Sequence, residues 1–81
     1  MVKVAQGSAV LLSNREKEVI QWMCRGKTNW EIGQLMNISE YTVKNHVSKI
    51  LKKIEASNRQ HAVAKALEMG LISLSEDNSS Q

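Results

Sequence analysis

Four segments of the chain each begin at a side chain that can cap a helix and continue with apolar residues at helical spacing. This repeated pattern constrains the fold more than any other feature of the sequence. The capping residues are Ser13, Thr28, Ser39, and either Ser57 or Asn58. Glu16 and Glu31 stand three residues after the first two caps, which completes a capping-box pattern at each position. Since no stretch shows the alternation of a strand, the chain is predicted to be all-α.

The apolar residues within these segments predict one shared core. The inward positions are expected to be Val19, Ile20 and Met23, then Ile32, Leu35 and Met36, then Val43, Val47, Ile50, Leu51 and Ile54, and finally Ala62, Val63, Ala66 and Leu67. Gly26, Asn37 with Ile38, and Gly70 separate or end the segments. Hydrophobic residues make up 42% of the 81 residues, which is enough for a compact core. The expected architecture is a four-helix bundle-like domain.

The chain divides into three parts. Residues 12–74 should form the folded domain, residues 1–11 an N-terminal arm or linker remnant, and residues 75–81 a polar, disordered tail. Cys24 is the only cysteine, so no internal disulfide can form, and no Cys/His cluster has metal-ligand spacing. No metal or cofactor is therefore expected.

Two functional classes are disfavoured at this stage. No apolar run approaches the length of a membrane span, which together with the single cysteine predicts a cytoplasmic protein without membrane contact. An enzyme is the weakest candidate, because the chain is too short to enclose a substrate pocket and shows no nucleophile–base set.

The second and third segments are joined by only a few residues, which forces the two helices to cross rather than to stack antiparallel. Such a pair is a helix-turn-helix. In that arrangement the second helix, here from about Glu40 to Ile54, can lie in the major groove of DNA, and the N-terminus of the first can meet a phosphate.

The third segment carries donor-rich side chains opposite its apolar ones. They are Tyr41, Lys44, Asn45, Ser48, Lys49 and Lys52. Lys can donate to guanine N7 and O6, and Asn can form two hydrogen bonds with adenine. The formal net charge is only +3, but seven basic and three acidic residues between Arg25 and Arg59 concentrate positive charge there. A Lys-rich helix face can equally be a solvated surface, and this helix alone leaves both interpretations open.

The start of the second segment favours a DNA partner. Lys27, Thr28, Asn29 and Trp30 combine a charge, a hydroxyl, an amide and free backbone N–H groups at the positive end of a helix dipole. These groups can seat a phosphate while Thr28 also caps the helix. The indoles of Trp22 and Trp30 are expected to pack at the edge of the core, with contact to phosphate or sugar as the alternative for Trp30.

Five stretches, correctly ordered over about residues 12–74, resemble one known family. They are Leu12-Ser13-x-Arg15-Glu16-x-Glu18-Val19, Gly26-Lys27-Thr28-x-x-Glu31-Ile32, Ile38-Ser39-x-x-Thr42-Val43-Lys44-x-His46-Val47-x-x-Ile50-Leu51-x-Lys53-Ile54, Asn58-Arg59-x-x-Ala62-Val63 and Gly70-Leu71-Ile72. The family is the LuxR-type domain, also called the GerE-like or NarL/FixJ-type output domain.

The resemblance implies a sequence-specific transcription regulator that binds double-stranded DNA as a homodimer on two half-sites. It places Lys44, Asn45 and Ser48 on base-facing positions, to which the outer face of the helix adds Tyr41. Together with the start of the second segment, the positions that contact the DNA backbone are Lys27, Thr28, Asn29, Trp30, Thr42, Lys49 and Lys52. The fourth helix usually supplies the dimer contact, and its outward side carries His61, Ala64, Lys65 and Glu68. Glu18 falls on an acidic position that holds the scaffold, and Arg15 and Glu16 are expected to do likewise.

Several alternatives stay open from the sequence. The fourth helix could make the chain a protein-interaction module that docks RNA polymerase or a sensor domain. Family members usually carry a receiver or small-molecule-binding domain ahead of this module, so the chain is either a stand-alone regulator or an excised output domain. A domain this small could also be monomeric in solution and pair only on its operator.

Overall fold

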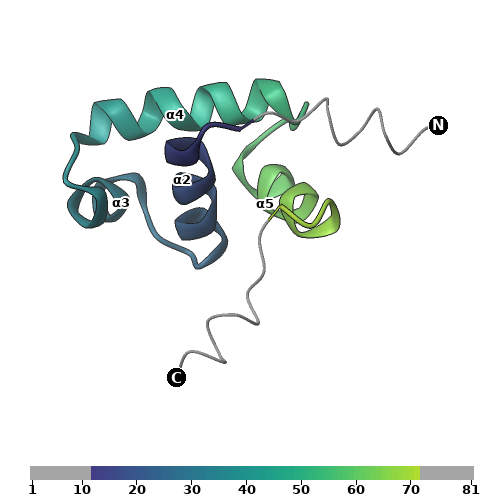
Figure 1. The fold of residues 1–81 in the computed structure, drawn as a ribbon, viewed down its shortest axis with the longest axis horizontal. Helices are drawn as coiled ribbons and strands as arrows, with labels where there is room; N and C mark the ends of the chain where they lie inside the picture. Colours follow the sequence, from purple (N-terminus) through teal and green to yellow (C-terminus); the bar gives the residue numbers. More distant parts are fainter. Residues whose placement is uncertain (1–11, 72–81) are drawn as a thin grey trace.

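The computed structural model describes residues 12–71. This range forms four helices and no strand: α2 (Asn14–Cys24), α3 (Asn29–Met36), α4 (Glu40–Lys53) and α5 (Arg59–Glu68). α4 lies along one side of the molecule, and α2 lies beneath it between α3 and α5 (Figure 1). The predicted all-α architecture is confirmed. The predicted arm at residues 1–11 and tail at residues 75–81 lie outside the described residues.

Side-chain caps start all four helices. Ser13 Oγ accepts from the Glu16 N–H at 3.1 Å, and the Ser13 N–H donates to Glu16 Oε1 at 2.9 Å, so the first predicted capping box is formed. Thr28 and Glu31 form the second in the same way. At α5 the cap is Asn58, whose side-chain oxygen accepts a backbone N–H of the first turn, and this decides between the two predicted candidates.

A tight turn joins α3 to α4. Asn37 adopts the left-handed conformation with φ of 59°, and the Ile38 N–H then donates to the Gly33 carbonyl at 2.9 Å. A Cβ at Gly33 would lie 2.7 Å from the Ile38 carbonyl oxygen, so the backbone would have to shift to accommodate it. The backbone of α3 therefore closely approaches the turn into α4 at Gly33, where only glycine fits without a shift.

One apolar core fills the space between the four helices. Its buried residues are Leu12, Val19, Ile20, Met23, Ile32, Met36, Val43, Val47, Ile50, Ile54, Ala62 and Ala66. The expectation was wrong for Leu35 and Leu67, which are 50% and 43% exposed. At 3.6 residues per turn, Leu35 and Leu67 lie roughly 100° and 120° from the middle of the buried arc of their helices. The short helices α3 and α5 thus bury a narrower stripe than their apolar residues suggest.

Trp22 packs at the edge of this core, as expected, and the Arg25 guanidinium lies 5.2 Å from the centre of its ring. Leu71 also packs against the core. None of the helices that residues 12–71 form is long and apolar enough to cross a membrane.

Candidate nucleic-acid interface

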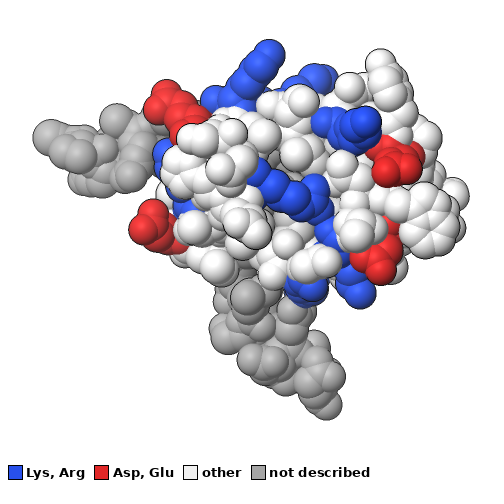
Figure 2. Space-filling view, turned by 180° about the vertical axis from the view of Figure 1, so that it is seen from behind, with Lys and Arg blue, Asp and Glu red and all other residues white. Residues whose placement is uncertain are grey.

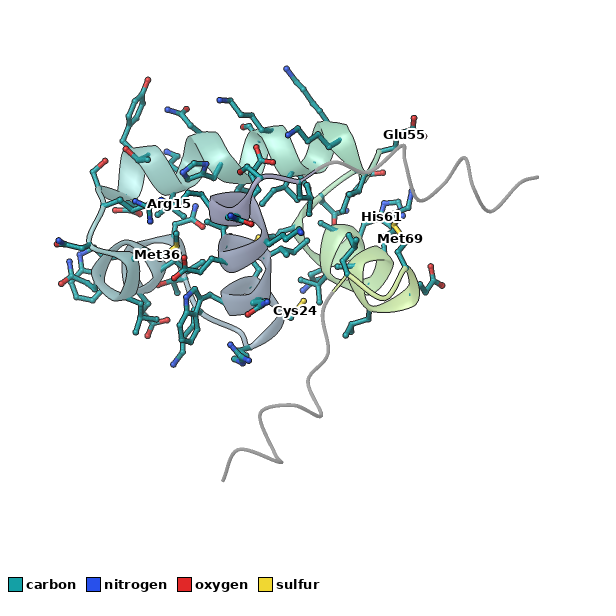
Figure 3. All side chains as sticks on the ribbon, viewed as in Figure 1. Arg15, Cys24, Met36, Glu55, His61 and Met69 are labelled. Atoms are coloured by element: carbon teal, nitrogen blue, oxygen red, sulfur yellow. The ribbon has the colours of Figure 1, made fainter. Side chains whose placement is uncertain are left out.

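The outer face of α4 presents the predicted donor-rich set to solvent. Its exposed members are Tyr41, Lys44, Asn45, Ser48, Lys49 and Lys52. The opposite side of the helix is buried in the core through Val43, Val47 and Ile50. Side chains project from the outer face of α4 away from the other three helices (Figure 3). The structure therefore brings the six side chains together on one accessible face.

The positive charge of this face is available to a partner. Within residues 12–71, Lys44, Lys49 and Lys52 form no ion pair, and the one acidic residue on α4 is Glu40 in its first turn. Figure 2 shows basic side chains protruding from the edge of the molecule that α4 forms. A row of unpaired lysines on one helix is suited to a polyanion, whose phosphates supply the missing negative charges.

Lys53 belongs to the scaffold instead. Its Nζ lies 2.8 Å from Glu16 Oε1, so it joins the end of α4 to the start of α2. Burial would raise the pKa of Glu16, but the hydrogen bonds from Lys53 and from the Ser13 N–H, with the charges of Lys53 and His46, together lower it below its ordinary value of 4.5. The expected scaffold role of Glu16 is thereby accounted for, whereas Glu18 is exposed.

The N-terminus of α3 keeps two backbone donors free of partners within the helix. The capping box uses the N–H groups of Thr28 and Glu31, which leaves those of Asn29 and Trp30 without an intrahelical acceptor. The hydrogen bond from the Thr28 N–H lowers the pKa of Glu31, so its carboxylate adds a negative charge at the same end. Trp30 is 58% exposed, which contradicts the expected packing at the core edge.

Arg59 is the residue of this region to which the sequence analysis gave no role. From the first turn of α5, its Nη1 donates to Asn29 Oδ1 and its Nη2 to the Lys27 carbonyl, both at 2.6 Å. Partial burial lowers the pKa of the guanidinium. A signal was present in the sequence: a cation at a helix N-terminus opposes the helix dipole, which favours a role for Arg59 away from α5.

Two more predicted contact residues have partners within the chain. Thr42 is half-buried, and its Oγ1 accepts from Ser39 Oγ at 2.9 Å. Lys65, predicted at the dimer face, is also half-buried and donates to the Glu55 carbonyl at 3.2 Å.

The remaining residues of the predicted dimer face, His61, Ala64 and Glu68, are exposed on α5. His61 Nδ1 accepts from the Ser57 N–H at 2.9 Å, which orients its ring. Leu67 adds apolar surface to the same helix. Among residues 12–71, no group of three or more His, Cys, Asp and Glu side chains is placed to hold a metal ion.

Comparison with known proteins places this geometry in a family. The chain matches the family of bacterial regulatory proteins, luxR family, over residues 10–66. Transcriptional activator protein SolR of Ralstonia nicotianae is 47% identical over 72 residues, covering 89% of this chain and 30% of SolR. The quorum sensing-dependent transcriptional regulator RpaR of Rhodopseudomonas palustris is 51% identical over 63 residues, covering 78% of this chain and 26% of RpaR. The chain thus spans less than a third of either relative.

The fold agrees with the sequence match. The solved structure of the transcription factor GerE superposes with a TM-score of 0.73 and 36% identity, covering 78% of this chain and 94% of GerE. The chain therefore belongs to the luxR family of bacterial regulatory proteins and carries the DNA-binding helix-turn-helix domain of these transcriptional regulators.

Proposed function

We propose that residues 12–74 form a unit that binds a specific DNA sequence by inserting α4 into the major groove. The observation that carries the proposal is the segregation of α4 into a buried apolar side and an exposed, unpaired basic side. A helix with this outer face can hydrogen-bond base edges while its apolar side stays in the core. The side chains assigned to bases are Lys44, Asn45, Ser48 and Tyr41.

Contacts to the DNA backbone fix the register of α4 in the groove. The assigned residues are Lys27, Thr28, Asn29, Trp30, Thr42, Lys49 and Lys52. The two free N–H groups at the start of α3 support this assignment, because a helix N-terminus favours an anion. The exposed indole of Trp30 supports it too, since its N–H can donate to a phosphate.

The regulator binds as a homodimer, with α5 of one copy against α5 of the other. The interface residues are His61, Ala64, Lys65 and Glu68. Exposed Leu67 supports a protein contact on this helix, because two copies can remove its apolar surface from water. Such a dimer recognises a two-fold symmetric operator whose half-sites lie about one helical turn apart.

The same exposed leucine also favours a second candidate function, in which α5 docks RNA polymerase or a sensor domain. Ionic strength separates the two functions. Binding through Lys–phosphate contacts weakens steeply as salt rises, whereas apolar docking responds little.

The test is selection of bound duplexes from a random DNA library with the purified chain at physiological salt. Enrichment of a symmetric site is the expected result, and it would yield the operator directly. A folded chain that enriches no sequence would contradict autonomous, sequence-specific binding.

A further inference from the structure

We infer that Arg59 is a positioning residue for DNA binding: it engages the acceptor oxygens of Asn29 and Lys27 at the start of α3, so that neither oxygen faces a phosphate. The inference rests on the proposed binding of DNA. It starts from the two 2.6 Å hydrogen bonds through which the Arg59 guanidinium joins α5 to Asn29 and Lys27, residues 30 and 32 positions away in the sequence.

The orientation of the Asn29 side chain follows from the chemistry of its partner. A guanidinium has only donors, so the atom of the carboxamide that faces Arg59 must be the oxygen. The NH₂ group of Asn29 is then turned away from Arg59, and Asn29 is the first residue of α3, at the positive end of the helix dipole. A free carboxamide could instead present its oxygen, which repels a phosphate.

The second hydrogen bond acts on the backbone that leads into α3. The Lys27 N–H donates to the Trp22 carbonyl at 3.1 Å, and the Lys27 carbonyl accepts from Arg59. Hydrogen bonds therefore fix the orientation of the peptide groups on both sides of Lys27. The Lys27 carbonyl dipole is engaged by a cation, so it does not oppose an anion at this helix end.

The position of Arg59 in the chain argues against a role in stabilising α5 itself. As the first residue of α5, it stands at the positive end of that helix dipole, where a cation is unfavourable. Its half-buried guanidinium reaches back to α3 and not outward to water. Lys cannot replace it, because an ammonium cannot span two acceptors with the planar fork of a guanidinium.

The test compares Arg59→Lys and Arg59→Ala with wild type and with Gln60→Ala, an exposed change on the next residue of α5. Binding to the selected operator and to an unrelated duplex is measured by fluorescence anisotropy over a salt series. Both Arg59 variants should bind the two duplexes about fivefold to tenfold more weakly, with the ratio between duplexes unchanged. In Arg59→Lys the slope of log K against log salt should stay close to that of wild type, because the variant keeps its charge and the lost contacts come from uncharged N–H groups. Gln60→Ala should match wild type.

A second variant, Asn29→Asp, tests the same inference if the Arg59 variants lose stability. Asp offers Arg59 the same acceptor oxygen and a stronger partner, so the melting temperature should hold or rise. It has no NH₂ group and adds a negative charge, so DNA affinity should fall although the fold is retained.

Two outcomes overturn the inference without touching DNA binding itself. One is wild-type affinity for both duplexes in a folded Arg59→Ala variant. The other is Asn29→Asp binding as tightly as wild type. If the wild-type chain itself binds neither duplex, the proposed function fails, and the role of Arg59 in it fails with it.

Discussion

The exposed residues of α4 differ in the part of DNA that each is proposed to contact. Lys44 and Asn45 are assigned to base edges and Lys52 to the backbone, although all three are exposed on the same face. Lys44→Ala or Asn45→Ala should cost about 1–3 kcal/mol on the selected operator and relax the preference at particular bases. Lys52→Ala should weaken binding to every sequence alike and lower the salt slope by about one.

Titrations of the three variants against operator duplexes with single base changes distinguish these roles. Equal weakening on all duplexes by Lys44→Ala and Asn45→Ala would show that neither residue contacts bases. An unchanged slope in Lys52→Ala would remove that residue from the backbone contacts.

Glu16 should make the fold sensitive to acid. Its pKa in the folded domain is lowered below 4.5, so the unfolded chain takes up this proton at a higher pH than the folded one. The stability that depends on the carboxylate is therefore complete above about pH 4.5 and is lost as the pH falls through the lower, folded pKa. Glu16→Gln should remove this part of the acid dependence, as measured by urea midpoints across that range.

Glu18→Gln is the matched control, since Glu18 is an exposed carboxylate on the same helix. It should leave the acid dependence nearly as in wild type. If Glu16→Gln and wild type lose stability in parallel on acidification, the Glu16–Lys53 pair does not contribute as described.

At the scale of elements, the crossing of α3 and α4 depends on Gly33. Helix propensity alone predicts that Gly33→Ala stabilises α3 by about 1 kcal/mol. The contact of 2.7 Å between the new Cβ and the Ile38 carbonyl oxygen predicts the opposite sign, a loss of about 1–3 kcal/mol. Urea denaturation decides the sign, with Gln34→Ala, exposed on the same helix, as the control. A more stable Gly33→Ala domain would mean that the turn can move aside.

The apolar periodicity of a helix predicts its buried residues only where a neighbouring helix covers the apolar face. α4 contacts all three other helices, and most of its predicted inward residues are buried. α3 and α5 are shorter and buried over a narrower arc, which is why Leu35 and Leu67 were assigned to the core and are exposed. Periodicity shows which residues share a face, but the arc that is covered depends on the packing of other elements.

At the scale of the whole molecule, a dimer contact through α5 would rest on one helix of 10 residues, which predicts association that depends on DNA. Sedimentation should show a monomer without DNA and two copies on a full operator.

Ala64→Glu places a second acidic residue on the exposed face of α5, next to Glu68, and should leave the fold intact. It should abolish cooperative binding to the full operator while binding to a single half-site stays unchanged. A variant that still binds the full operator cooperatively would move the dimer contact away from α5.

The sequence by itself determined most of the local structure of this protein: its helices, the caps of α2, α3 and α4, and the exposed face of α4. Those features depend on residues a few positions apart, as in the capping boxes of Ser13 and Thr28, so a linear pattern contains them. Only the tertiary structure decided which basic side chains have partners within the chain and which remain available to DNA. Lys53 pairs with Glu16 37 positions away, and Arg59 reaches Asn29 across 30 positions. Such pairs form because helix packing brings distant side chains within hydrogen-bond distance, and no spacing along the chain encodes that distance.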